Sequence, residues 1–524
     1  MKKISILLIF TVLFFTIFGC GKEVLENPLL NTDTKYNKTE QSSIIVESPL
    51  LNDDTKSDKT ENSSSSIIEN NLSNNDNDFN EIDNSSLILS VVHPDFKLTD
   101  DFIEPVEKIA VASDDYIPIS TLGEFFKIGL NLNANYILMN DIELDGNYTA
   151  FKDFSGILNG NGYVIKGANG PLFYNIKSGY IFNLGIEATG RLSTIGAYSP
   201  FVYHVASVYS PATFASIAIK IEDTMIRNCY FKGEINIDEA YSSAGLVCFA
   251  DNSQIISCYN AGDFSGYTIG GIVNSAKDCI IYNCFNSGSL YSAENAGGIV
   301  AFGYANGILL NIANCYNSGL ISTAGYNPNN YQSNDYRLKE DYYASGIIGA
   351  IDDSWYSSDS ATSIVEISFC FNVGSVYSKS YYPSGICTIT SNSADISISY
   401  CYNAGDLNYK HWGWDAYDGG YGITCGEYDK NAKIFECYNI GNGVLGGISS
   451  RCKNLFGCYF LDNCETATLD GALFSNNAVT KLTETEMREK SNFKNFDFDF
   501  FWQMGKGDYP YPVFKQKNPL TENS

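Results

Sequence analysis

A short motif that recurs eight times constrains the fold of this chain more than any other feature of its sequence. Each copy places an Ile or Leu three residues before a Cys and an aromatic residue directly after it, and six copies continue with Asn. The cysteines of the eight copies are Cys229, Cys258, Cys284, Cys315, Cys370, Cys401, Cys437 and Cys458. A unit repeated every few tens of residues is typical of a solenoid, in which each coil is completed only by its neighbours.

A second motif alternates with the first and consists of a Gly followed by Ile or Leu. Its glycines are Gly245, Gly271, Gly298, Gly346, Gly385, Gly422 and Gly447. Each of these lies between two cysteine motifs, and the 45 Gly and 37 Tyr of the 524-residue chain suit such a repetitive β architecture. Short apolar runs separated by Gly or Asn turns predict strands rather than helices.

Together the two motifs resemble the GLUG-motif repeats of bacterial surface proteins. Residues 141–144 and 154–162 resemble the usual first coils of those repeats, and the resemblance covers about residues 130–515. It implies an all-β fold, a right-handed parallel β-helix, with short capping helices at both ends.

The residues of the motif suit a parallel β-helix. Coils stacked about 4.8 Å apart would place equivalent side chains in ladders, with alternate residues of each strand pointing inward. We therefore expect the Ile and the Cys to face the core, and the aromatic residue to face outward and stack on its equivalents. The Asn is expected to face inward at a turn, where side-chain amides can bond along the stack. The repeated glycines are expected to supply corners with positive φ.

The fifteen cysteines of the chain admit three interpretations. In an exported protein they could form disulfides, and eight at one repeat position could bind a metal ion. However, residues 181–185 look like an earlier copy of the motif with Leu184 in the place of the cysteine. A position that accepts Leu is a core position, so we expect buried, reduced thiols. Disulfides stay an alternative, because equivalent cysteines of adjacent coils would have Cα atoms within bonding range.

The N-terminus predicts export. Lys2 and Lys3 precede an apolar run over residues 4–18, which is too short for a comfortable membrane span and has the pattern of a secretory signal. Residues 17–20 resemble the lipobox of bacterial lipoproteins, which implies cleavage before Cys20 and lipidation of its thiol. We then expect the protein on the outer face of the cell membrane, with the membrane as a partner through this lipid. An ordinary signal peptide followed by an unrelated cysteine is the alternative.

Composition and motifs divide the chain into five segments. Residues 1–19 are the predicted lipoprotein signal peptide, and residues 20–115 are a predicted disordered tether, rich in Asn, Ser and acidic residues. Such a segment has too few apolar side chains to offset the entropy of ordering. Residues 116–145 are predicted as an N-terminal cap, residues 146–465 as the β-helix and residues 466–524 as a C-terminal cap.

Two capping boxes predict the helices of the caps. Thr121 with Glu124, and Thr483 with Glu486, have the spacing at which the two side chains satisfy each other's backbone N–H groups. We therefore expect one helix over residues 121–130 and another after Thr483. The aromatic residues that follow the second helix are expected to seal the open end of the core.

Charge and motif content exclude several functions. A net charge of −27 without a basic stripe argues against nucleic acid as a partner. No cofactor motif is found, since the glycine pattern over residues 441–446 is followed by a repeat strand and not by a helix. GLUG repeats also occur in IgA-cleaving zinc metallopeptidases, whose protease unit needs His-Glu-x-x-His. None of His93, His204 and His411 is followed by Glu, so that activity is excluded for this chain.

Three aromatic-rich insertions give the candidate binding residues. They follow Cys315, Cys370 and Cys401, and all three leave the repeat at the same place, so they are expected to emerge on one edge. The candidate ligand-binding residues are Trp412, Trp414, Tyr417, Tyr381, Tyr382, Tyr342 and Tyr343. Clustered Tyr and Trp suit stacking on sugar rings or gripping a protein partner. The alternative is that the insertions pack their aromatic rings on one another.

Three classes of function are compatible with these features. The first is a membrane-anchored surface lipoprotein whose β-helix serves adhesion or the binding of extracellular carbohydrate or protein. The second is a polysaccharide lyase or glycoside hydrolase built on a β-helix, with Asp335, Asp352 and Asp353 as candidate acids. The third is a surface scaffold that binds nothing.

Overall fold

A computed structural model describes most of the chain after residue 105. The described ranges are residues 106–145, 148–188, 212–236, 240–304, 307–323, 342–352, 363–378, 381–409, 419–426, 428–468, 478–507 and 509–515. All of them belong to the unit Ile82–Ser524, the larger of two into which the chain divides. Cys20, and the predicted signal peptide and nearly all of the predicted tether, lie outside the described residues.

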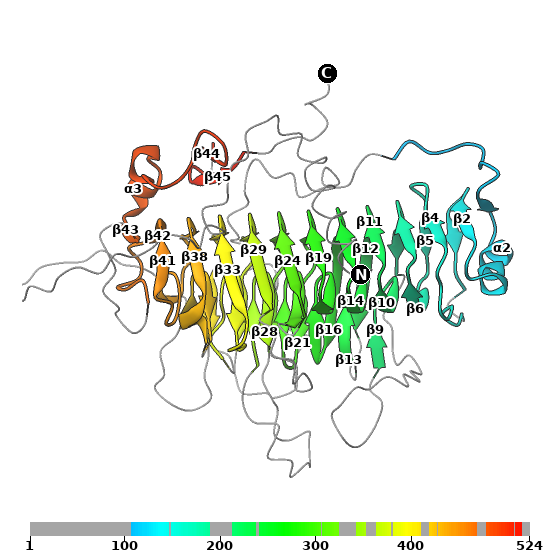
Figure 1. The fold of residues 1–524 in the computed structure, drawn as a ribbon, viewed down its shortest axis with the longest axis horizontal. Helices are drawn as coiled ribbons and strands as arrows, with labels where there is room; N and C mark the ends of the chain where they lie inside the picture. The colour runs from blue at the N-terminus through cyan, green and yellow to red at the C-terminus, as the bar shows by residue number, and fades with distance from the viewer. Residues whose placement is uncertain are drawn as a thin grey trace, which may run out of the picture. The chain divides into compact units, whose positions relative to one another are not determined.

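The described residues form a parallel β-helix, in which strands of successive coils pair side by side (Figure 1). We name its four sheets A to D. One coil, over residues 254–277, passes through them in the order A, B, D, C. The all-β, parallel β-helix fold predicted from the repeats is confirmed.

Sheets A and B hold the longest rows of paired strands. Sheet A contains, in pairing order, β1 (Ile117–Ile119), β2 (Asn135–Leu138), β4 (Ile157–Asn159), β7 (Tyr180–Phe182), β11 (Met225–Arg227), β15 (Gln254–Ile256), β19 (Ile280–Tyr282), β24 (Leu309–Ala313), β29 (Ile364–Ser368), β33 (Asp395–Ser399), β38 (Lys433–Phe435) and β41 (Asn454–Phe456). Sheet B contains β3 (Ile142–Glu143), β5 (Val164–Lys166), β8 (Gly185–Glu187), β12 (Tyr230–Asn236), β16 (Tyr259–Gly266), β20 (Phe285–Asn286), β25 (Tyr316–Asn317), β30 (Phe371–Asn372), β34 (Tyr402–Asn403), β39 (Tyr438–Asn439), β42 (Cys458–Leu461) and β43 (Val479–Leu482). A side row of sheet B continues from β16 through β21 (Leu290–Ser292), β26 (Ile321–Thr323), β31 (Val376–Ser378) and β35 (Leu407–Tyr409).

Sheets C and D complete the coils. Sheet C contains β6 (Phe173–Lys177), β10 (Ala218–Glu222), β14 (Val247–Asp251), β18 (Val273–Lys277), β23 (Val300–Tyr304), β28 (Ile348–Asp352), β32 (Cys387–Ile389) and β37 (Thr424–Cys425). Sheet D contains β9 (Ala212–Phe214), β13 (Ala240–Ala244), β17 (Thr268–Gly270), β22 (Ala296–Gly297) and β27 (Ala344–Ser345), and the pair β36 (Gly420–Tyr421) and β40 (Val444–Gly446) follows it. Strands β1 to β3 already join sheets A and B, so the parallel pairing begins ahead of residue 146, where the sequence places the start of the β-helix.

The Ile of the first motif forms one wall of the core. In sheet A these residues pair in register from coil to coil, and all are buried. They are Ile226, Ile255, Ile281, Ile312, Ile367, Ile398, Ile434 and Leu455. Burial of one such side chain contributes about 1.5–3 kcal/mol, so this ladder is a main source of stability.

The eight cysteines of the first motif form a second wall next to the first. The fourteen cysteines that the structure describes are all buried and free. Neighbouring rungs touch, since the N–H of Cys229 reaches Sγ of Cys258 at 3.4 Å and that of Cys401 reaches Sγ of Cys437 at 3.3 Å. Leu184 stands in the same column before Cys229 and is fully buried, which confirms that this is a core position. Burial raises the pKa of Cys279, a thiol outside this column, to about 12, so that thiol is not a reactive nucleophile.

The aromatic and Asn residues of the motif form two further ladders, as predicted. Rings of adjacent coils stack from Tyr230 through Tyr259 to Tyr438, with centroids 4.8–4.9 Å apart and planes within 10°. The asparagines are buried, and the Nδ2 of every rung except the last, Asn439, donates to Oδ1 of the next coil at 2.7–2.8 Å. The asparagine ladder consists of Asn260, Asn286, Asn317, Asn372, Asn403 and Asn439.

The glycines of the second motif do not supply positive-φ corners, so the prediction is wrong for them, whereas Gly457 directly before Cys458 does have a φ of 63°. The corner conformation falls on the residue directly before each cysteine of the first motif, for example Asn283 with φ 55° and Asn314 with φ 54°. The glycines are required by close approach between coils. A Cβ on Gly298 would lie 2.1 Å from the carbonyl oxygen of Gly346 and 2.6 Å from Cβ of Asn317.

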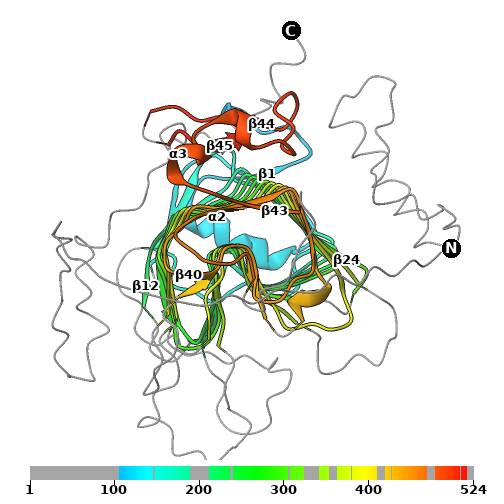
Figure 2. The ribbon, with the colours of Figure 1, turned by 90° about the vertical axis from the view of Figure 1, so that its left-hand side faces the viewer.

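Both predicted capping helices are present. Helix α2 (Leu122–Phe126) begins at the Thr121 capping box, continues as the 3-10 helix η1 (Lys127–Leu130) and lies across the first coil (Figures 1 and 2). Helix α3 (Glu484–Met487) begins at the Thr483 capping box. Two further 3-10 turns are η2 (Asp429–Asn431) and η3 (Lys490–Asn492).

The closing segment, residues 483–515, packs mainly on the side of the coils. The prediction that its aromatic residues seal the open end of the core is therefore corrected. Strand β43 extends sheet B, but the hairpin of β44 (Trp502–Met504) and β45 (Pro512–Phe514) lies outside the coils (Figure 2). There the closing segment packs against the later rungs of the stacked aromatic row, from Phe371 to Tyr459, with the rings of Tyr402 and Phe514 5.4 Å apart. Tyr438 Oη also donates to the carbonyl oxygen of Pro512 at 2.6 Å. The outward-facing rings need this cover because a bare aromatic row would expose a large apolar surface.

Candidate functional site

The three insertions leave and re-enter the coils at equivalent positions. They depart after β26, β31 and β35, which pair with one another in register. They return at Ser345, Ser384 and Tyr421, which are linked by parallel bridges. We call this border between sheets B and D the insertion edge. Its strands fix where each inserted segment begins and ends.

Tyrosines from the three insertions meet on the insertion edge. The Tyr343 and Tyr381 rings lie 5.1 Å apart edge to face, and Tyr381 is 5.8 Å from Tyr382. Tyr382 in turn lies 4.6 Å from Tyr409 and 5.7 Å from Tyr421. We call these five residues the tyrosine cluster. Edge-to-face contacts of this kind each contribute about 0.5–1.5 kcal/mol beyond burial.

The cluster has a buried base and a half-exposed rim. Tyr409 and Tyr421 are buried, and desolvation raises the pKa of Tyr409 to about 12. Tyr343, Tyr381 and Tyr382 are half-buried. The rim therefore combines fixed ring positions with ring surface that a ligand could reach.

The predicted binding residues fall into two groups. Tyr343, Tyr381 and Tyr382 are brought together in the cluster, and the half-buried Tyr342 directly precedes it. Trp412, Trp414 and Tyr417 lie outside the described residues, as does the lipidation candidate Cys20. Ligand binding by these residues stays a prediction.

A glutamate on the insertion edge was missed by the sequence predictions. Glu294 lies in the short connection between β21 and β22, one coil before the first insertion. Its N–H donates to the carbonyl oxygen of Tyr267 at 2.8 Å. Desolvation raises the pKa of its carboxyl group to about 7. Only the register between coils reveals its position, because Glu294 belongs to neither repeated motif.

The carboxylates considered for polysaccharide cleavage do not form a pair in the described structure. Asp352 ends β28 in sheet C, opposite Tyr304 of β23 and on a different sheet from the tyrosine cluster. Asp335 and Asp353 lie outside the described residues. Among the residues with described positions, no group of three His, Cys, Asp or Glu side chains is arranged to hold a metal ion.

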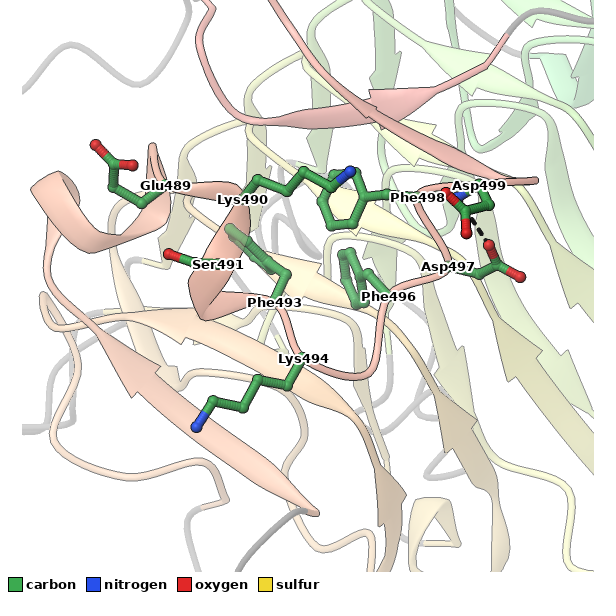
Figure 3. Close-up of a pocket in the computed structure, with 9 residues that line it drawn as sticks. All are labelled: Glu489, Lys490, Ser491, Phe493, Lys494, Phe496, Asp497, Phe498 and Asp499. Carbon is green, nitrogen blue, oxygen red and sulfur yellow. Dashed lines mark hydrogen bonds between the residues drawn. The ribbon is translucent and has the colours of Figure 1, made fainter.

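An open depression lies on the closing segment, away from the repeats that form the insertion edge. Figure 3 shows its lining, which is Glu489, Lys490, Ser491, Phe493, Lys494, Phe496, Asp497, Phe498 and Asp499. Lys490 Nζ stands 5.0 Å from the centre of the Phe498 ring, and Asp497 Oδ1 accepts the N–H of Asp499 at 2.9 Å. Phe493 and Phe496 belong to the cover of the aromatic row, so the depression is explained by the packing of this segment.

Comparisons with known proteins give no family. No protein-family model matches the chain, and no curated protein matches it. Among solved structures, a candidate immunoglobulin A1 protease from Bacteroides ovatus is similar with 15% identity and a TM-score of 0.30, over 77% of this chain and 93% of that one. An IgA1 protease is similar with 12% identity and a TM-score of 0.30, over 70% of this chain and 21% of that one.

Proposed function

We propose that this protein is a lipid-anchored cell-surface protein whose β-helix presents the insertion edge to an extracellular carbohydrate or protein. The observation that carries the proposal is the convergence of tyrosines from three separate insertions. Tyr343, Tyr381 and Tyr409 are far apart in sequence, yet all three belong to one cluster with a half-exposed rim. Tyr combines a large apolar face with a polar tip, which suits both sugar rings and protein hot spots.

Retention of ligands tests the binding function. The full mature protein is immobilised and exposed to panels of polysaccharides, peptidoglycan and extracellular-matrix proteins. We expect retention of at least one ligand, and loss of it in Tyr343→Ala and Tyr381→Ala. Tyr180→Ala is the matched control, because Tyr180 is also half-buried against an aromatic ring but lies on sheet A. An equal loss of ligand retention in Tyr180→Ala would contradict a role of the insertion edge in binding.

The same panels separate the other two classes of function. A polysaccharide-degrading enzyme would release soluble products, whereas a scaffold would retain nothing. The double variant Trp412→Ala with Trp414→Ala is expected to lose capture without unfolding, and unchanged capture would remove both residues from the site.

The membrane anchor is part of the proposal and is tested separately. Residues 1–20 combine the signal pattern with the lipobox-like end. Among the described residues, which begin at residue 106, no helix is long and apolar enough to cross a membrane. We expect wild-type protein from whole cells to partition into detergent and to incorporate labelled fatty acid. The variant Cys20→Ala is expected to lose both properties, and retention of the label would contradict lipidation at this residue.

A further inference from the structure

Glu294 occupies a defined place beside Tyr342, the residue that directly precedes the tyrosine cluster. Strand β22 pairs Ala296 with Ile269 on one side and with Ala344 on the other. Counting two residues back from both pairs places Glu294 between Tyr267 and Tyr342. The acid therefore stands in a column of tyrosines along the insertion edge.

The backbone around Glu294 is fixed. Its N–H donates to Oγ of Ser292 at 3.2 Å as well as to Tyr267. The neighbouring Asn295 Oδ1 accepts the N–H of Tyr343 at 2.7 Å, and the N–H of Ala296 donates to the carbonyl oxygen of Tyr343 at 2.8 Å. The acid is thus held in position relative to the first residue of the cluster.

Within the described ranges, the Glu294 carboxylate lacks a neutralising group. Across the described part of the chain, no salt bridge or hydrogen bond to this carboxylate is present, and desolvation alone accounts for the rise in its pKa. A half-buried, partly desolvated carboxylate gains from a cationic partner, because ion pairing restores the interaction that burial removed.

We propose that the insertion edge binds a glycan with free amino groups, whose ammonium pairs with Glu294 while neighbouring sugar rings lie on Tyr343 and Tyr381. This inference rests on the proposed binding function and names its ligand class. An ammonium near tyrosine rings gains a further cation–π attraction. Anionic glycans are disfavoured by the net charge of −27, and a fully acetylated neutral glycan would leave the carboxylate unpaired.

The shape of the edge favours a glycan over a basic peptide. The tyrosines stand on successive coils, so a stiff polysaccharide laid along the edge can touch several rungs at once. A flexible lysine-rich peptide would lose more conformational entropy when it was ordered along the same surface.

Calorimetry of the full mature protein with matched oligosaccharides tests the inference. The ligands are a hexasaccharide of β-1,4-linked glucosamine and its fully N-acetylated counterpart, at neutral pH, where part of the amino groups is protonated and part of the Glu294 carboxyl group is ionised. We expect the amino form to bind at least about tenfold more tightly, a difference of about 1.4 kcal/mol. Glu294→Gln is expected to abolish this preference, and Glu294→Asp to retain part of it. Glu234→Gln, which removes one exposed acid from sheet B, should keep the preference.

The outcomes that overturn the inference are distinct. Equal affinity for the two hexasaccharides, or an unchanged preference in Glu294→Gln, overturns the role of Glu294. The proposed function survives that result if Tyr343→Ala still weakens binding. Binding of polylysine through Glu294 with no binding of either sugar overturns the glycan class. If neither sugar binds, the inference is overturned. The proposed function is overturned as well only if no ligand of the panels is retained.

Discussion

At the scale of single residues, the interior rungs of the asparagine ladder are completely hydrogen bonded. Asn317 Nδ2 donates to the carbonyl oxygen of Gly319 at 2.9 Å and to Oδ1 of Asn372 at 2.8 Å, and its Oδ1 accepts from Asn286. All of these groups are buried. Loss of one rung would therefore leave polar groups of two neighbouring coils without partners.

We predict that Asn317→Ala destabilises the protein by several kcal/mol, since each buried polar group left unpaired costs about 1–3 kcal/mol. Urea unfolding measures the change in free energy. Asn140→Ala serves as control, because Asn140 is exposed and makes only a long 3.4 Å hydrogen bond. A change for Asn317→Ala no larger than that of the control would contradict the ladder as a source of stability.

Replacing a repeated glycine and replacing a helix glycine by alanine are predicted to change stability in opposite directions. Gly298→Ala would place a methyl group 2.1 Å from a backbone oxygen that cannot move aside, so a loss of more than about 3 kcal/mol is expected. Gly123 lies in α2, and a Cβ added to it would meet nothing within 4 Å. Gly123→Ala should raise stability by up to about 1 kcal/mol. Thermal melts of the two variants check both signs, and a tolerated Gly298→Ala would show that the coils can separate there.

At the scale of elements, the closing segment meets the coils at a titratable contact. Glu436 has φ 48° and is 7% exposed. Burial raises its pKa to about 7, a hydrogen bond from the backbone N–H of Asp497 opposes the rise, and the Asp497 carboxylate adds to it. The folded state therefore binds this proton more tightly than the unfolded state, whose pKa is about 4.5. Stability from this group is present at low pH and is lost as pH rises from about 4.5 through about 7.

We predict that hydrogen exchange in the closing segment accelerates across this pH window, beyond the intrinsic increase with pH. Glu436→Gln should remove part of that dependence, since the neutral amide imitates the protonated acid. The variant keeps the pH dependence that comes from other buried acids. These are Glu294 and Asp429, and burial raises the pKa of Asp429 to about 6. Glu489→Gln, an exposed change on the same segment, should behave like wild type. An identical pH profile for Glu436→Gln and wild type would contradict the contact's role.

At the scale of the whole molecule, the thiol ladder reports on the integrity of the stack. We predict that the fourteen described cysteines resist a thiol reagent in the native protein and react together on unfolding without reductant. Counting the modified thiols by mass spectrometry checks this. Few reactive thiols after unfolding would instead indicate disulfides between neighbouring rungs such as Cys229 and Cys258.

Much of the fold could be predicted from sequence because its contacts repeat. The residues of one coil touch their equivalents in the next, so Leu184 alone identifies the cysteine column as core. The closing segment could not be placed in this way, since its contacts occur once. One sequence signal does point to where the closing segment lies. Phe369 and Tyr400 stand at the positive-φ corner that Asn occupies in other coils, and Phe501 of the closing segment packs against both rings. Glu294 was missed for a related reason, because its neighbours are set by register and not by a motif.

The shared register of successive coils has a consequence for how the number of coils can change when the gene mutates. Asn260 and Asn286 are 26 residues apart and make the same contacts, one coil removed. An in-frame deletion or duplication of one such unit would join surfaces that already fit, and would leave both end helices unchanged. Recombination between the repeated segments of the gene can therefore shorten or lengthen the molecule in steps of one coil, about 4.8 Å each.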